Sequence, residues 1–261
     1  MGTYFFVKET MKMKWGSFGT VHFATLIFAA ALLALIYVFL KNRNLKTQLW
    51  VLGIMSLMGN AATVYNLLAW GQPLEYLPLH LCALNGLLLP IAVVTRHKKL
   101  CNLLLLWSLG AFVALIANGT MANADIFGWP FFFYYFAHIS ELGVPLLLFG
   151  LGLVEKDSKC IGSTMTITWA AYTGIYGINK LINWLCALYQ VTRADGSLVQ
   201  VNYMYSMGPI DPLSGALWKI LPFEYWYMLL AMPIIAAYLV AIYGPQILAR
   251  RREKRRHRYA I

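Results

Sequence analysis

The chain has 261 residues, of which 60 % are hydrophobic and 12 % are charged. Soluble domains carry about 25 % charged residues, so this composition excludes an ordinary water-soluble globular domain. The formal net charge is +11, and seven of the 21 Lys and Arg residues lie in the segment RRREKRRHR, directly after an apolar stretch. A basic segment in that place is typical of contact with anionic lipid headgroups and argues against nucleic-acid binding.

Apolar runs of about 20 residues recur along the chain, and one such run can cross a hydrocarbon core of about 30 Å. We therefore predict an all-α polytopic membrane protein: a single domain over residues 1–261, built as a bundle of seven transmembrane helices, with a basic cytoplasmic tail at 250–261. The predicted spans are 18–40, 48–70, 77–95, 100–118, 130–153, 161–190 and 222–247.

The connecting segments differ in charge, and this difference predicts an orientation. Fifteen Lys and Arg residues fall in 41–46, 96–99, 155–159 and the tail, whereas five fall in the N-terminal segment and the remaining connections, and Lys180 lies toward the outer end of its span. Cytoplasmic loops carry the excess of positive charge. We therefore predict that the N-terminus lies outside and the C-terminus in the cytoplasm, in a multi-pass protein of the plasma membrane.

Seven spans raise the possibility of a retinal protein, which needs a lysine inside its last span to form the Schiff base. The segment 222–247 contains no lysine, and Lys219 precedes it. A retinal protein is therefore excluded on chemical grounds.

Ionisable side chains inside a span are costly and mark functional sites by default. His22 lies near the outer end of the first span, His80 and Cys82 in the first turns of the third, and His138 and Glu141 in the outer half of the fifth. These groups are predicted to share one layer, the outer third of the membrane. The same outer half holds further polar residues, namely Asn85, Asn118, Asn179, Asn183 and Glu224.

Helical spacing separates the roles of these residues. His80 and Cys82 are two positions apart and point away from each other if that turn is helical, whereas Asn85 shares the face of Cys82. A base for Cys82 must then come from another helix, and His138 is the best placed by depth. Glu141 follows His138 by three positions and can fix the tautomer of its ring, as the acid does in a catalytic triad.

A metal site is the first alternative for the histidines. His22, His80, His138 and Cys82 are suitable zinc ligands, but they have no closely spaced ligand pair of the kind that zinc sites show. We predict no metal and no cofactor.

The four cysteines leave three interpretations open. A cysteine in an apolar helix is usually a small hydrophobic residue, which is the reading for Cys101, Cys160 and Cys186. Acylation is an alternative at Cys101 and Cys160, which lie at the cytoplasmic starts of their predicted helices. A disulfide between Cys82 and Cys186 is a further alternative.

The segment 202–222 is unusual for a connection because tyrosines and methionines alternate with turn-forming Gly and Pro. We predict that it folds back over the bundle and forms a lid or lines the substrate site through Asn202, Tyr203 and Asp211.

Four stretches carry a family resemblance: FGTVHFATL, LPLHLCAL, FFFYYFAHISELG and NYMYSMGPIDPL, in this order. Together they resemble the YwaF family of bacterial integral membrane proteins, which is similar to the animal transmembrane-protein-164 acyltransferases. The resemblance implies transfer of fatty acyl chains between phospholipids, with Cys82 as the nucleophile and His138 as its partner, in a bacterial membrane.

We therefore predict a lipid acyltransferase, or an acyl-ester hydrolase with the same first half-reaction, that acts on a phospholipid or lysophospholipid. Asn85 or Tyr134 could donate a hydrogen bond to the oxyanion. The alternative is a transporter or receptor for a small molecule or lipid, because a polar layer at one depth also describes an outward-facing binding pocket.

Overall fold

A computed structural model describes residues 13–69, 72–117, 121–210 and 212–259, with side chains up to residue 249. Within these ranges the chain is helical, and its β-structure is limited to two isolated bridges. The α-helices are α1 (Thr20–Leu40), α2 (Leu45–Ser56), α3 (Met58–Ala69), α4 (Leu81–Thr95), α5 (Lys98–Ala117), α6 (Trp129–Gly150), α7 (Cys160–Leu188), α8 (Pro212–Ile220) and α9 (Met232–Tyr259). The 3-10 helices are η1 (Pro73–Glu75), η3 (Tyr203–Tyr205) and η4 (Trp226–Ala231).

The all-α prediction is confirmed, and helices occupy all seven segments predicted as spans. Five described helical segments are long and apolar enough to cross a membrane: Thr20–Leu40, Leu45–Ala69, Lys98–Ala117, Trp129–Gly150 and Trp226–Ala249. α4 is apolar but has only 15 residues, fewer than any of these five segments. α7 is not among the five. The span number of seven and the orientation of the termini therefore stay predictions.

The second predicted span is broken into two helices. α2 ends at Ser56 and α3 begins at Met58, with Leu57 between them. The Ser56 hydroxyl donates to the carbonyl of Gly53, and the Leu57 amide bonds to Ile54 rather than continuing the regular ladder. A serine that bonds back to its own helix bends the axis, which hydropathy does not register.

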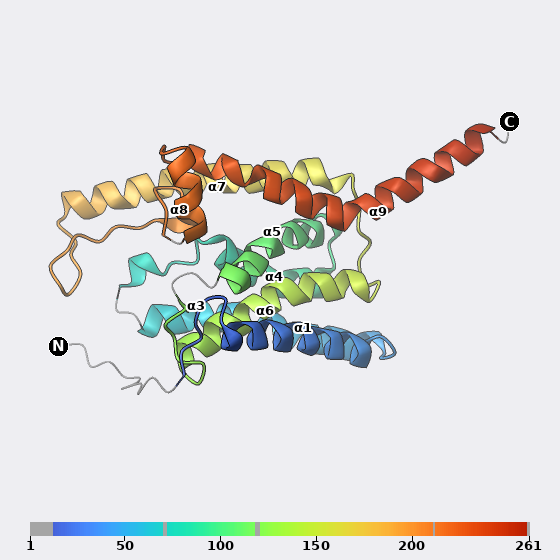
Figure 1. Ribbon diagram of the computed structural model, residues 1–261, viewed down its shortest axis with the longest axis horizontal. Helices are drawn as coiled ribbons and strands as arrows, with labels where there is room; N and C mark the ends of the chain where they lie inside the picture. The colour runs from blue at the N-terminus through green and yellow to red at the C-terminus, as the bar shows by residue number, and fades with distance from the viewer. Residues whose placement is uncertain (1–12, 70–71, 118–120, 211, 260–261) are drawn as a thin grey trace.

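The last predicted span also differs in its details. It begins as the 3-10 helix η4 at Trp226, becomes α-helical at Met232 and continues as a helix to Tyr259. The preceding connection, predicted as a loop, contains the helix α8. In Figure 1, α9 extends beyond the end of the bundle formed by the other helices.

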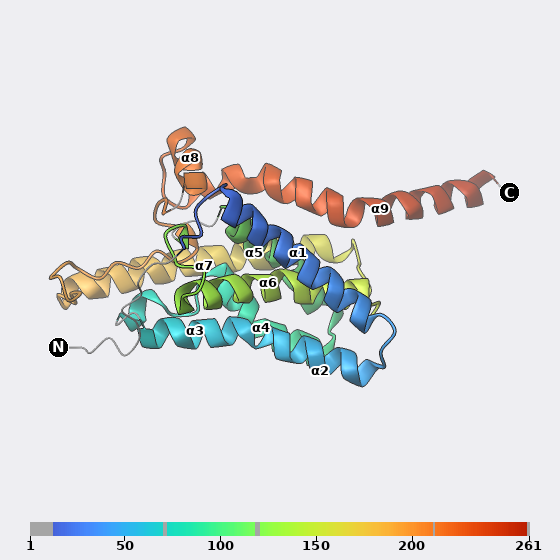
Figure 2. The same cartoon turned by 60° about the horizontal axis from the view of Figure 1, so that its bottom comes forward.

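α6 is the central helix of the bundle. It contacts α1, α2, α3, α4 and α5, and its contact with α5 is the most extensive between any two described elements. Figure 2 shows α6 between α1 on one side and α3 and α4 on the other. Most of α6 is buried, and its polar side chains His138, Ser140 and Glu141 are among the buried ones, so this helix can carry a site that is shielded from lipid.

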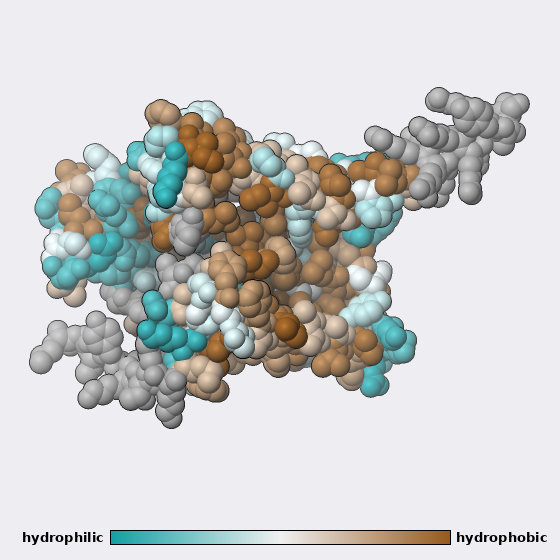
Figure 3. All heavy atoms as spheres, viewed as in Figure 1, coloured by the Kyte–Doolittle hydropathy of each residue, from teal (hydrophilic) through white to brown (hydrophobic). Residues whose placement is uncertain are grey.

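Hydrophilic residues gather at the two ends of the bundle, and apolar residues cover the band between them (Figure 3). At one end, Lys98 pairs with Glu155 at 3.3 Å and with Asp157 at 2.8 Å. At the other end, Arg193 pairs with Glu75. The basic connections 96–99 and 155–159 therefore meet at the same end, as the charge pattern predicts.

The segment after α7 is tied to the bundle by two asparagines of that helix. Asn179 accepts a hydrogen bond from the Tyr203 amide at 3.0 Å and donates to the Tyr203 carbonyl at 2.9 Å. Asn183 makes the same pair of bonds with the backbone of Val201, at 2.7 and 3.0 Å. These asparagines therefore hold the connection in place and are not part of a shared polar pocket.

Candidate functional site

The site forms where the first turn of α4 meets the middle of α6. The chain does not enter α4 at the surface: residues 76–80 are non-helical, and Leu77 and Leu79 pack against the buried cluster around Tyr172 and Tyr203. α4 therefore begins inside the bundle. This start brings Cys82, the second residue of α4, level with His138, the tenth residue of α6.

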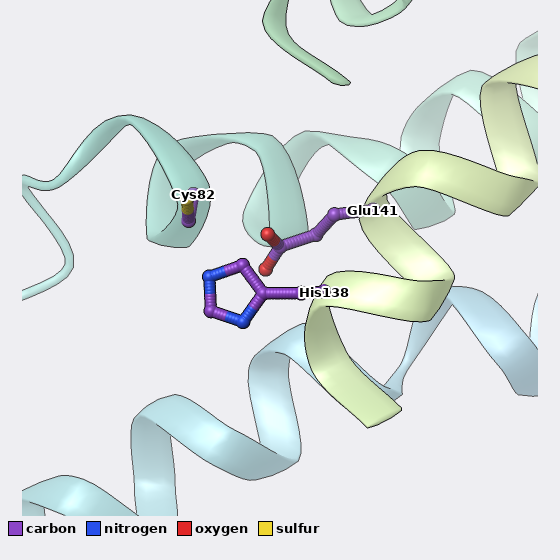
Figure 4. A group of neighbouring side chains, drawn as sticks. All are labelled: Cys82, His138 and Glu141. Atoms are coloured by element: carbon purple, nitrogen blue, oxygen red, sulfur yellow. The ribbon is translucent and has the colours of Figure 1, made fainter. Parts of the chain in front are cut away.

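Cys82, His138 and Glu141 come together at this point. Each offers one polar atom, the Cys82 Sγ, a ring nitrogen of His138 and a carboxyl oxygen of Glu141, and these three atoms all lie within 4.8 Å of one another. His138 and Glu141 are 8 % and 2 % exposed, whereas Cys82 is half-buried. Figure 4 shows the imidazole and the carboxyl reaching from α6 toward the cysteine on α4.

A hydrogen bond fixes the tautomer of His138. Its Nδ1 lies 2.6 Å from the carbonyl oxygen of Tyr134, one turn earlier in α6. A carbonyl oxygen only accepts, so Nδ1 must carry the proton and donate it. The neutral ring then has its lone pair on Nε2, the nitrogen on the Cys82 side in Figure 4. The Tyr134 carbonyl therefore sets the tautomer, so the prediction that Glu141 does so is wrong, and His138 is arranged to accept a proton from the thiol.

Two prolines free backbone carbonyls beside the site, and two asparagines bind them. A proline has no N–H for the carbonyl four residues earlier. Pro145 therefore frees the carbonyl of Glu141, which accepts from Asn85 at 3.4 Å. Pro90 frees the carbonyl of Gly86, which accepts from Asn60 at 3.2 Å.

This pairing makes a specific prediction about Asn85, which is fully buried. Asn85→Ala should lower the thermal unfolding midpoint, because a buried carbonyl left without a donor costs about 1–3 kcal/mol. In a Pro145→Ala background the residue at 145 regains an N–H for the Glu141 carbonyl, so the same Asn85→Ala change should cost clearly less. Equal losses in both backgrounds would show that Asn85 stabilises the protein in another way.

α3 and α4 cross at a pair of glycines directly beside Glu141. A Cβ added at Gly59 would lie 2.7 Å from the Cα of Gly86 and 3.2 Å from Oε1 of Glu141. The backbones therefore touch, and the carboxyl of Glu141 lies against the crossing. Sequence analysis missed Gly59, Gly86 and Asn60. The sequence does carry one signal of free carbonyls in this region: Pro90 follows Gly86, and Pro145 follows Glu141, by four residues.

His80 and His22 lie apart from this cluster and have structural contacts. The His80 Nδ1 accepts from the Met204 amide at 3.3 Å, and its ring packs edge-on against Tyr203 with centroids 5.4 Å apart. His22 accepts from the Phe18 amide through Nδ1, so Nε2 carries the proton and donates to the Leu115 carbonyl at 2.9 Å. His80 thus anchors the 202–206 segment, and His22 joins α1 to α5.

The other described residues that were predicted for the site make hydrogen bonds or ion pairs outside this cluster. The Tyr134 hydroxyl donates to the Ala114 carbonyl at 3.1 Å, so it serves poorly as an oxyanion donor. Asn202 closes a turn by bonding to the backbone of Met207 and Gly208 at 2.9 and 2.8 Å. Tyr203 is fully buried and donates to the Leu74 carbonyl. Glu224 pairs with Lys180. Asp211 and Asn118 lie outside the described residues.

The cysteine alternatives are settled in part. All four cysteines are free, so the disulfide between Cys82 and Cys186 is not formed. Cys101, Cys160 and Cys186 are buried in the helical core, as expected of small hydrophobic residues. The zinc set considered from sequence comes together only in part: Cys82 and His138 meet, whereas His22 and His80 bond elsewhere.

The matched region of a known family covers all of these residues. The model of the TMEM164 family matches residues 17–243 of this chain, which is most of its length. The chain belongs to the TMEM164 family. No curated protein and no solved structure matches it. The resemblance to transmembrane-protein-164 proteins is thereby confirmed at the level of the family, while the YwaF assignment and a bacterial origin stay predictions.

The residues of the candidate site lie inside the region that matches the TMEM164 family. The matched region begins before α1 and ends inside α9, so it contains Cys82, His138, Glu141 and the connection that His80 anchors. The basic segment at 250–258 lies beyond it. The family and the apolar helices together identify an integral membrane protein.

Proposed function

We propose that this TMEM164-family protein is a membrane-embedded lipid acyltransferase, or an acyl-ester hydrolase with the same first half-reaction, and that Cys82 is its nucleophile. The observation that carries the proposal is the cluster of Cys82, His138 and Glu141, with His138 held in the tautomer that leaves Nε2 as a base. Nucleophilic catalysis commonly uses a thiol beside a base that a third group orients, and here the Tyr134 carbonyl orients His138.

In the first half-reaction, the Cys82 proton moves to Nε2 of His138, and the thiolate attacks the carbonyl carbon of a phospholipid acyl ester. The C–O bond of the ester then breaks, and the leaving lysolipid oxygen takes the proton from the imidazolium. The product is an acyl thioester on Cys82 and a lysophospholipid. The position of Cys82 in the first turn of α4 supports this step, because a helix N-terminus stabilises negative charge on a thiolate.

In the second half-reaction, the hydroxyl of a lysolipid gives its proton to Nε2 and attacks the thioester carbon. The C–S bond breaks, and the Cys82 thiolate recovers the proton from the imidazolium. If water replaces the lysolipid, the same steps give a free fatty acid. An isolated thiolate is costly in an apolar layer, so the nearby imidazolium is needed in both half-reactions.

Substrate access and oxyanion stabilisation both have candidates. Cys82 is half-buried while its partners on α6 are buried, so an ester can approach from the cysteine side. We propose Asn85, one turn after Cys82 on α4, as the oxyanion donor: its side-chain amide has two N–H groups, of which one bonds to the Glu141 carbonyl. The single hydroxyl proton of Tyr134 already goes to Ala114. A lost oxyanion donor typically lowers the rate by about 10²–10³.

The acyl-enzyme is the direct test of the proposed function. Purified protein in lipid nanodiscs is incubated with a phospholipid that carries an activated acyl ester, and the intact mass is measured. We expect one acyl group per chain on Cys82, released by hydroxylamine as a thioester. His138→Ala should slow its formation by about 10²–10⁴, the usual contribution of a general base.

Cys186→Ala is the matched control, because Cys186 is a free buried cysteine on α7, and it should be acylated like the natural protein. Acylation that survives in Cys82→Ala, or that moves to another cysteine, would contradict the proposal. Uptake of a solute or lipid without any acyl-enzyme would instead favour the transporter alternative.

A further inference from the structure

Two facing helices present polar pairs with the same spacing. α4 contributes Cys82 and Asn85, and α6 contributes His138 and Glu141, each pair three residues apart. Residues at this spacing lie on one face of a helix. The side-chain amide of Asn85 reaches the Glu141 backbone at 3.4 Å, so the two pairs meet across one interface.

This interface holds buried oxygen atoms without partners. Among the residues that the structure describes, three buried side-chain atoms lack a hydrogen-bond partner, and two of them are Oδ1 of Asn85 and Oε2 of Glu141. Both residues are nearly or fully buried, at 0 % and 2 % exposure. A buried acceptor without a donor or cation is costly, so the site is suited to a positively charged ligand.

The donor set identifies the class of that ligand. A thiolate, an imidazole and a carboxylate together suit zinc and similar transition metals, whereas Mg²⁺ and Ca²⁺ prefer oxygen ligands alone. Zinc bonds of about 2.0–2.3 Å place tetrahedral ligand atoms about 3.3–3.8 Å apart. The three donor atoms already lie within 4.8 Å of one another, so small side-chain rotations close the remaining gap.

The hydrogen bond of His138 fits the same ligand. Metal-binding histidines almost always donate their other ring N–H to a carboxylate or a backbone carbonyl, which orients the ring. His138 donates Nδ1–H to the Tyr134 carbonyl at 2.6 Å and thereby leaves Nε2 for a metal. This bond would prepare the ring equally for a proton or for a metal ion.

We propose that Cys82, His138 and Glu141 bind one Zn²⁺ ion, and that the zinc-bound protein is an inactive state. The Cys82 thiol loses its proton to solvent on binding, and its sulfur lone pair and the Nε2 lone pair of His138 both go to the metal. Neither is then available for acyl transfer. The binding stands on the cluster alone, and the inactive state rests on the proposed function.

Cobalt provides a direct readout of this site, because Co²⁺ replaces Zn²⁺ and gives a thiolate-to-cobalt charge-transfer band in the near ultraviolet. The purified full-length protein, freed of metal with a chelator, is titrated with Co²⁺. We expect the band to saturate at one equivalent and to disappear when Zn²⁺ is added. Absence of the band, or saturation well above one equivalent, would overturn the proposal.

Variants assign the ligands. Cys82→Ala and Cys82→Ser should abolish the band, and Glu141→Gln should weaken Co²⁺ binding by about tenfold or more. Cys186→Ala, on α7 and away from the cluster, is the matched control and should keep the band. The thermal unfolding midpoint of each variant is measured without metal to show that it is folded. A band that persists in folded Cys82→Ser would overturn the assignment.

The inactive state is tested on the same samples. One equivalent of Zn²⁺ should block acylation of Cys82, and a chelator should restore it. Full acylation in the presence of bound Zn²⁺ would overturn the inactive state. If the cobalt band forms while metal-free protein never acylates, the proposed function fails and the metal site stands. If Cys82 is acylated while no cobalt band forms, the metal site fails and the proposed function stands.

Discussion

A Cys82→Ala variant is expected to lose acyl transfer by about four orders of magnitude or more, because removal of a catalytic nucleophile leaves only binding and oxyanion stabilisation. The measurement is the rate of acyl exchange between a labelled phospholipid and a lysophospholipid in nanodiscs. Cys82 is half-buried and touches no disulfide partner, so its truncation should leave the fold intact. The thermal unfolding midpoint checks that point.

The comparison with His138 makes this prediction sharper. Residues that act as one unit have non-additive effects on the rate, and the Cys82 and His138 polar atoms lie within 4.8 Å of each other. The double variant Cys82→Ala with His138→Ala should therefore be no slower than Cys82→Ala alone. A double variant slower by the product of both single effects would show that His138 acts on another step.

A Gly59→Ala variant is expected to lose stability. The added Cβ would meet the backbone of Gly86 at 2.7 Å and Oε1 of Glu141 at 3.2 Å. Backbone atoms cannot rotate away as a side chain does, so α3 must move off α4, at a cost of about 1–3 kcal/mol. The thermal unfolding midpoint in detergent should fall.

Gly53→Ala is the control for helix propensity. Gly53 lies in α2, six residues before Gly59, and an added Cβ there has no neighbour within 4 Å. Alanine is favoured over glycine in a helix by about 0.5–1 kcal/mol, so this variant should be neutral or more stable. If Gly59→Ala behaves like Gly53→Ala, the two helices do not meet as closely as the glycine crossing indicates.

The sequence alone determined the helical class and the positions of the helical segments. Apolar runs and their interruptions are local properties of the chain, and lipid leaves no other way to satisfy the backbone. That Cys82 and His138 lie close together was predicted by counting residues along those segments. The spacing of His138 and Glu141 followed from helix geometry, and the structure brings both together with Cys82.

The tertiary structure decided what the other polar residues do. His22, His80 and Asn179 were predicted to share one layer with the site, yet each bonds to a backbone group on a neighbouring segment. Which way a side chain faces depends on how its helix is rotated against its neighbours, and one sequence does not encode that rotation locally.

The surroundings of the site likewise depend on how the helices pack against one another. α4 begins inside the bundle because residues 76–80 pack beneath the 202–206 segment rather than continuing the helix outward. Asn60 and Asn85 bind carbonyls that become available only because α4 and α6 each contain a proline. The local sequence pattern determined which residues were available for chemistry near Cys82. The contacts between helices determined which of these residues lie close to it.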